Sequence, residues 1–174
     1  MMMLYLILIA LFVGFAIKQL DFIIDVERRK TSLLDVIVLV FLSGILLGIL
    51  LSKESNFSTI GYAVLLAQVF SGKLDDRSFW LLGGIALGTA YIIGIPSIDV
   101  SAFIFLFIAA ILDEVEWKHW LLDKRPFLPL ASLIWFLLFN DPTYLMGIIS
   151  FDIGYHTSEI INKKNYILAT LPRM

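Results

Sequence analysis

The chain has 174 residues, of which 60% are hydrophobic and 16% charged, with a net charge of −2 and a mean hydropathy of +0.92. Soluble domains are typically about 45–50% apolar and about 25% charged, so this composition excludes an ordinary cytosolic globule, a disordered tail and a nucleic-acid-binding protein. The absence of cysteine excludes disulfides, thiolate metal sites and cysteine nucleophiles.

Long uncharged stretches predict a bundle of membrane-spanning helices. A spanning helix needs about 20 mostly apolar residues, and seven of them would leave no room for a separate soluble domain. We therefore predict a single all-α transmembrane domain, a multi-pass protein of the cell membrane. Its helices are predicted at about 2–26, 33–52, 57–74, 78–95, 99–121, 126–139 and 143–162.

Breaker residues separate these helices. Gly94-Ile95-Pro96-Ser97 is expected to end the fourth helix, and Asn140-Asp141-Pro142 is a turn signal between the sixth and seventh. The apolar runs on either side of this turn are short, so residues 126–153 form either two spans or a re-entrant hairpin. Gly84-x-x-x-Gly88 on the fourth helix, together with Ser43, Gly44 and Gly48 on the second, is typical of close helix packing in lipid. This pattern predicts that these two helices form the centre of the bundle.

The basic residues predict the orientation of the bundle. With the N-terminus outside, every Lys and Arg except Lys53 falls in an inner segment or at an inner helix end. Because cytoplasmic segments carry an excess of Lys and Arg, we predict an outer N-terminus and a cytoplasmic C-terminus.

Two carboxylates are expected deep in the membrane. At about 1.5 Å per residue, Asp152 lies about 16 Å below Asp141, which is close to the middle of a hydrocarbon core about 30 Å thick. Asp113 lies about 21 Å from Asp99 by the same reasoning. A charge at such depth costs at least about 2.5–3.5 kcal/mol, so it must face a polar cavity, bind a metal or join a structural ion pair.

The spacing of polar residues on the seventh predicted helix places a histidine on the same face as Asp152. Asp152, His156 and Glu159 are separated by four and three residues, which places them on one helical face. Facing helices in bundles build metal sites from carboxylates and imidazoles, and carboxylates alone favour Mg²⁺ or Mn²⁺ over Zn²⁺ or Fe²⁺. Arg77 and Arg125 are candidates for phosphate binding, because arginine makes bidentate contacts with phosphate; alternatively they only set the topology.

The leading hypothesis is a divalent-metal-dependent membrane enzyme acting on a lipid or isoprenoid phosphate at the inner leaflet. The alternatives are a cation or proton-coupled transporter that uses Asp152 and His156, a structural membrane subunit, and an intramembrane aspartyl protease, which needs only two membrane aspartates. The expected partner is membrane lipid, and homo-oligomer formation is left as a possibility. The predicted site comprises Asp152 and His156 as catalytic groups, Asp75, Asp76, Asp113, Glu116 and Asp152 as metal ligands, and Arg77 and Arg125 as substrate-binding residues.

Overall fold

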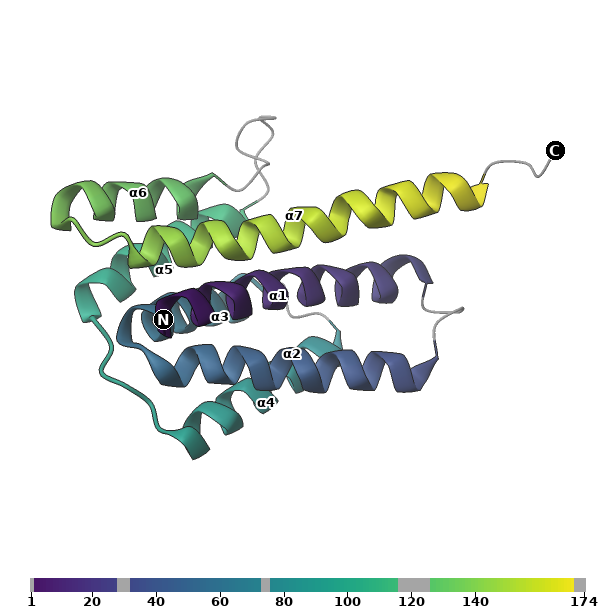
Figure 1. Cartoon of the computed structure of the whole chain (residues 1–174), viewed down its shortest axis with the longest axis horizontal. Coiled ribbons are helices and arrows are strands. Elements are labelled where there is room, and N and C mark those ends of the chain that lie inside the picture. The colour runs from purple at the N-terminus through teal and green to yellow at the C-terminus, as the bar shows by residue number, and fades with distance from the viewer. Residues whose placement is uncertain (1, 28–31, 73–75, 116–125, 171–174) are drawn as a thin grey trace.

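The chain folds as a bundle of helices in the computed structural model, which describes residues 2–27, 32–72, 76–115 and 126–170 (Figure 1). Within this part of the chain there are seven α-helices and no strands, which confirms the all-α prediction. The helices are α1 (Met2–Phe22), which continues into a π-helical turn η1 (Ile23–Glu27), α2 (Leu33–Lys53), α3 (Ser55–Phe70), α4 (Arg77–Ile93), α5 (Val100–Glu114), α6 (Phe127–Phe139) and α7 (Thr143–Thr170).

Polar residues and glycine start and stop these helices where the turn signals predict. The Ser32 hydroxyl accepts a hydrogen bond of 3.2 Å from the backbone N–H of Asp35, which is the usual contact of an N-cap residue. α4 ends at Gly94, whose φ of 113° is accessible to glycine at little cost. α6 ends at Asn140, which adopts the left-handed conformation with a φ of 56° and thereby directs the chain into α7.

Three carboxylates cap α3, α5 and α7 at one end of the bundle. Glu54, Asp99 and Asp141 each accept a hydrogen bond from a backbone N–H near the start of its helix, at 3.3, 3.0 and 3.0 Å. Two further contacts tie these ends together: the Asn56 side-chain amide donates to Asp141 at 2.8 Å, and the backbone N–H of Asp99 donates to the Thr59 hydroxyl at 3.2 Å. These three acids therefore serve as helix caps.

The surroundings of two of these caps shift their pKa values in opposite directions. Hydrogen bonds from the Ser101 side chain and from the backbone N–H groups of Ala102 and Ser101 hold the pKa of Asp99 below its usual value. Burial raises the pKa of Glu54, although the N–H of Phe57 opposes the shift. Their contributions to stability should therefore depend on pH with opposite sign.

The first and last helices lie side by side and run in the same direction (Figure 1). Gly14 on α1 and Gly154 on α7 make this contact close. A Cβ at Gly14 would overlap the carbonyl oxygen of Phe151, and a Cβ at Gly154 would overlap that of Leu11. Only the absence of both side chains lets the two backbones approach to this distance.

A buried stripe of small and polar residues on α7 extends this contact. Ser150, Gly154, Ser158 and Asn162 recur at every fourth position and are all buried, because residues four apart share a helical face. The Ser158 hydroxyl donates to the Gln19 side chain on α1 at 3.0 Å and accepts from the Asn162 amide at 3.4 Å. Small size and internal hydrogen bonding together explain why this polar stripe is buried.

The glycines of α4 do not form the centre of the bundle, contrary to the expectation from their spacing. α4 lies at the edge of the bundle and packs on α2 (Figure 1). There the close approach depends on Gly44 and Gly48 of α2, which contact α4 directly. Gly83, Gly84 and Gly88 face away from this contact, since a Cβ at any of them would meet no atom within 4 Å.

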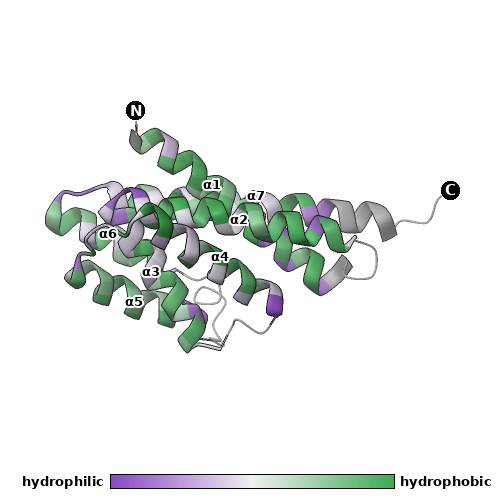
Figure 2. Cartoon of the chain, turned by 90° about the horizontal axis from the view of Figure 1, so that it is seen from below, coloured by the Kyte–Doolittle hydropathy of each residue, from purple (hydrophilic) through white to green (hydrophobic). Residues whose placement is uncertain are grey.

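Two helical stretches, Met3–Asp25 and Leu33–Lys53, are long and apolar enough to cross a membrane, which indicates membrane association. α4 and α6 are apolar but shorter, with 17 and 13 residues. α7 is one continuous helix of 28 residues, which is longer than one arm of the alternative hairpin over residues 126–153. Large apolar side chains are exposed on all seven α-helices, and most of the ribbon in Figure 2 has the green colour of hydrophobic residues.

Candidate functional site

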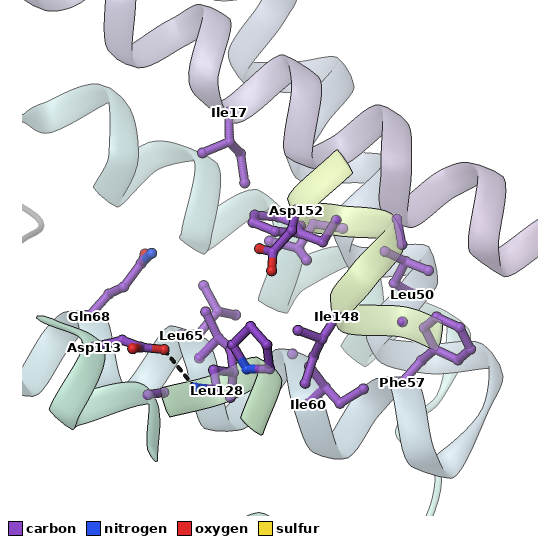
Figure 3. Close-up of a pocket in the computed structure, with 18 of the residues that line it drawn as sticks. Ile17, Leu50, Phe57, Ile60, Leu65, Gln68, Asp113, Leu128, Ile148 and Asp152 are labelled. Atoms are coloured by element: carbon purple, nitrogen blue, oxygen red, sulfur yellow. Dashed lines mark hydrogen bonds between the residues drawn. The ribbon is translucent and has the colours of Figure 1, made fainter. Parts of the chain in front are cut away.

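A cavity of 150 Å³ lies between six of the helices (Figure 3). α1, α2, α3, α5, α6 and α7 all contribute to its wall, whereas α4 does not. The wall is mostly apolar, and its polar side chains number four: Gln68 from α3, Asp113 and Glu114 from α5, and Asp152 from α7. The cavity therefore joins two deep carboxylates that the sequence analysis places in the site, Asp113 and Asp152.

Figure 3 shows where the labelled polar side chains lie along the cavity. Gln68 and Asp113 lie together at one end. The Asp152 carboxylate points into the cavity between that end and the opposite end, where Leu50 and Phe57 lie. The arrangement suits a ligand with one polar and one apolar part, because pockets use a few polar groups to orient a mostly apolar contact.

Asp113 holds the start of α6 against the end of α5. Asp113 is only 8% exposed. Its two carboxylate oxygens accept hydrogen bonds from the backbone N–H groups of Phe127 at 2.8 Å and Leu128 at 2.7 Å. Hydrogen bonds to an ionised acceptor are among the strong ones. Asp113 therefore joins the end of α5 to the start of α6.

The predicted face of α7 is divided between the cavity and the surface. Asp152 lines the cavity, but His156 does not, and its side chain is 65% exposed. The His156 ring Nδ1 lies 3.2 Å from a Glu159 oxygen, and Lys163 donates to the other Glu159 oxygen at 2.7 Å. The face of α7 that borders the cavity at Asp152 is therefore exposed one turn later, at His156.

Asp21, near the end of α1, has a structural partner. The Lys18 ammonium lies 2.6 Å from an Asp21 oxygen and 4.9 Å from the centre of the Tyr155 ring on α7. An ammonium group within about 6 Å of an aromatic ring is attracted to its face. Lys18 thus neutralises Asp21 and attaches this end of α1 to α7.

The other predicted site residues lie away from the cavity or outside the described residues. Asp76 caps α4 by accepting from the backbone N–H of Ser78 at 2.8 Å, and Arg77 is the first residue of α4; neither lines the cavity. Over the described ranges, no group of three or more His, Asp and Glu side chains is arranged to hold a metal. The predicted residues outside these ranges are Asp75, Glu116 and Arg125.

Two cavity residues were not among the predicted site residues. Glu114, one of whose carboxylate oxygens is fully buried, directly follows Asp113 at nearly the same depth, and this adjacency was an available signal. Gln68 is uncharged and stands alone in an apolar helix, so its proximity to Asp113 depends on how α3 packs on α5.

Comparison with known proteins finds no family model, no curated protein and no solved structure that matches the chain.

Proposed function

We propose that the chain is a multi-pass membrane protein with its N-terminus outside and its C-terminus in the cytoplasm. Soluble monomers rarely expose contiguous apolar patches of more than a few hundred Å², whereas here exposed apolar side chains include Leu33, Ile92 and Leu137, at 76, 84 and 71%. They lie on three different helices, which a lipid surround would cover. The excess of Lys and Arg at the predicted inner ends supports the orientation.

Within this bundle, the cavity is the proposed binding site for a lipid or isoprenoid phosphate on which the protein acts at the inner leaflet. The observation that carries the proposal is a mostly apolar cavity whose wall includes the carboxylates Asp113, Glu114 and Asp152. The apolar side chains would contact hydrocarbon, and the carboxylates would hold the phosphate through a cation.

A divalent cation is proposed to bring phosphate to the carboxylates of the cavity. Among the described residues, the cavity wall contains three carboxylates, and Mg²⁺ is commonly held by one or two carboxylates together with substrate phosphate oxygens. Asp152 and Glu114 are the proposed carboxylate ligands, and Gln68 and Asp113 also line the cavity. Such a site needs no protein cluster of three ligands, because the substrate supplies the remainder.

The other residues of the predicted site keep their proposed roles near the inner end of the bundle. Asp75, Asp76 and Glu116 are proposed to add further ligands, Arg77 and Arg125 to bind phosphate, and His156 to act as a general base. These roles are independent of the cavity itself. Each would be tested by substitution only after metal-dependent binding at Asp152 has been measured.

The composition of the cavity argues against the transporter alternative. A transport path needs polar groups on both sides of the midplane site, but the wall beyond Asp152 is formed by apolar side chains that include Leu50, Phe57 and Ile148. The aspartyl protease alternative requires two aspartates free to share a proton. Asp113 is instead committed to two backbone N–H groups.

The test is metal binding by the full chain in lipid nanodiscs, measured by Mn²⁺ electron paramagnetic resonance with and without butyl phosphate. Asp152→Asn should weaken Mn²⁺ binding at least about tenfold, as expected for loss of charge-assisted contacts worth about 1.5–3 kcal/mol. Asp35→Asn is the matched control, because Asp35 is an exposed acid bonded to Ser32 and lies outside the cavity lining. Equal Mn²⁺ binding by wild type and Asp152→Asn, or Asp152-dependent ion flux without phosphate binding, would overturn the proposal.

A further inference from the structure

The cavity is closed towards the end of the bundle where Glu54, Asp99 and Asp141 cap their helices, which we call the capped end. Hydrogen bonds between α3 and the starts of α5 and α7 hold this end together. The lining residues nearest to it are exposed by only 6, 5 and 3%: Leu50, Phe57 and Ile148. In the described part of the chain, these buried side chains leave a ligand no open route from the capped end.

The lining becomes more exposed with distance from the capped end. α1, α3, α5 and α7 all begin at the capped end and run away from it (Figure 1). On α1, Ala10 is 3% exposed, whereas Ile17, about 10 Å further along the helix, is partly exposed. The other three parallel helices show the same change, from Phe57 to Gln68, from Ala110 to Glu114 and from Ile148 to Asp152. Because four helices agree, the cavity opens away from the capped end.

Polar side chains of the lining lie at this opening. Gln68 is in the last turn of α3, Glu114 is the last residue of α5, and both are partly exposed. In Figure 3, Gln68 lies at the end of the cavity away from Leu50 and Phe57. Burying a polar group without partners costs free energy, whereas burying apolar surface is favourable. The polar part of a bound ligand would therefore stay at the opening, while its apolar part reaches the closed end.

We infer that the described part of the chain gives the cavity one entrance, away from the capped end, and that a ligand enters it with its apolar part leading. One residue from each of the four parallel helices borders this entrance: Ile17, Gln68, Glu114 and Asp152. The inference rests on the proposed function for its direction in the membrane. With the N-terminus outside, the entrance opens towards the inner leaflet, so the ligand arrives from that leaflet.

The first test uses single-cysteine variants, because the chain contains no cysteine that would react in the background. The full chain is reconstituted at no more than one copy per vesicle, and the vesicles are captured through an N-terminal tag, so that the capped end faces outwards. A charged, membrane-impermeant methanethiosulfonate added outside should label Lys53→Cys, an exposed position at the capped end. It should label Gln68→Cys, and Val115→Cys at an exposed position just after α5, only once the vesicles are permeabilised.

The second test asks whether the entrance controls access to the closed end. Ala10→Cys places a thiol in the buried part of the lining, and methyl methanethiosulfonate, which is small and uncharged, is the probe. Adding Gln68→Trp should slow its reaction at least about tenfold, because the reagent must then wait for a local opening of the packing. Leu66→Trp is the matched control on the same helix, 40% exposed and outside the lining, and should leave the rate unchanged. Leu50→Cys is a second reporter at the closed end, and melting temperatures show that each variant is folded.

The outcomes separate this inference from the proposed function. Labelling of Gln68→Cys from the side that labels Lys53→Cys would overturn the inference, as would rates at both reporters that Gln68→Trp slows no more than Leu66→Trp does. Labelling only after permeabilisation, together with slowing by Gln68→Trp alone, would support it. Neither test uses a metal or a phosphate. Failure of the Mn²⁺ measurement would therefore overturn the proposed function and leave the entrance standing.

Discussion

Substitution of Asp113 tests the junction between α5 and α6. The carboxylate accepts hydrogen bonds from two consecutive backbone N–H groups, those of Phe127 and Leu128, at 2.8 and 2.7 Å. Asp113→Asn keeps one acceptor oxygen and replaces the other with an NH₂ group, which cannot accept a hydrogen bond. Asp113→Ala removes both acceptors and leaves both N–H groups without this partner.

The expected losses follow from the number of bonds removed. A hydrogen bond to a charged group contributes about 1.5–3 kcal/mol, so Asp113→Asn should cost about that amount and Asp113→Ala about twice as much. For a chain of this length, 1 kcal/mol corresponds to about 2–4 °C in melting temperature. The melting temperature should therefore fall by about 3–12 °C for Asp113→Asn and by about 6–24 °C for Asp113→Ala.

The assay is thermal unfolding in detergent, followed by circular dichroism, without metal or phosphate so that ligand binding does not contribute. Asp35→Asn serves as the control, because its side chain pairs with Ser32 at an exposed position and should change the melting temperature by less than about 2 °C. If Asp113→Asn and Asp113→Ala both melt within about 1 °C of wild type, or if the alanine variant is the more stable of the two, the capping role of Asp113 is refuted.

Three further predictions concern the α1–α7 contact and the outer caps. Gly154→Ala should lower the free energy of unfolding by about 1–3 kcal/mol or more, because overlap with the carbonyl oxygen of Leu11 outweighs the gain of about 1 kcal/mol in helix propensity. The control variant, Gly84→Ala, should be neutral or stabilising. Equal melting temperatures for the two variants would contradict the overlap at Gly154. Asp99 contributes stability above its unfolded pKa of about 3.9 that is lost as pH falls through its lower folded value, so Asp99→Asn should flatten the acid limb of the plot of melting temperature against pH, and an unchanged limb would count against it. Glu54 acts in the opposite sense, since its contribution falls as pH rises from about 4.3 towards its raised folded value; Glu54→Gln should remove that decline, which the same titration would detect.

The helices and their ends were predictable because local chemistry determines them. The uncharged runs gave seven helices, and the turn at Asn140 lies directly after α6 as predicted. Gly94 likewise ends α4. Each of these features depends on residues within a few positions of one another, so the pattern in the sequence is sufficient.

Contacts between distant segments were less predictable, since they depend on which helix faces which. Glycine spacing pointed to Gly44 and Gly48, which contact α4, but also to Gly84 and Gly88, which contact no neighbouring helix. The carbonyl overlaps at Gly14 and Gly154 were not predicted, because their immediate sequences carry no paired-glycine motif. The intramembrane depth of Asp113 was inferred from helix length, yet its capping of α6 requires knowledge of where residue 127 lies. Depth and charge thus identified candidate residues, while packing decided which of them share a cavity.

The parallel contact between α1 and α7 has a consequence for the order of assembly during synthesis. Gly14 and Gly154 are about 140 residues apart in the sequence, and a ribosome adds about 5–20 residues per second. The close-packing face of α1 must therefore wait roughly 7–28 s for its partner after it has been made. During that interval Gln19 cannot yet receive the hydrogen bond that Ser158 donates in the folded protein. Of the described helices, α1 is made before the others, and α7, on which it packs, is made last.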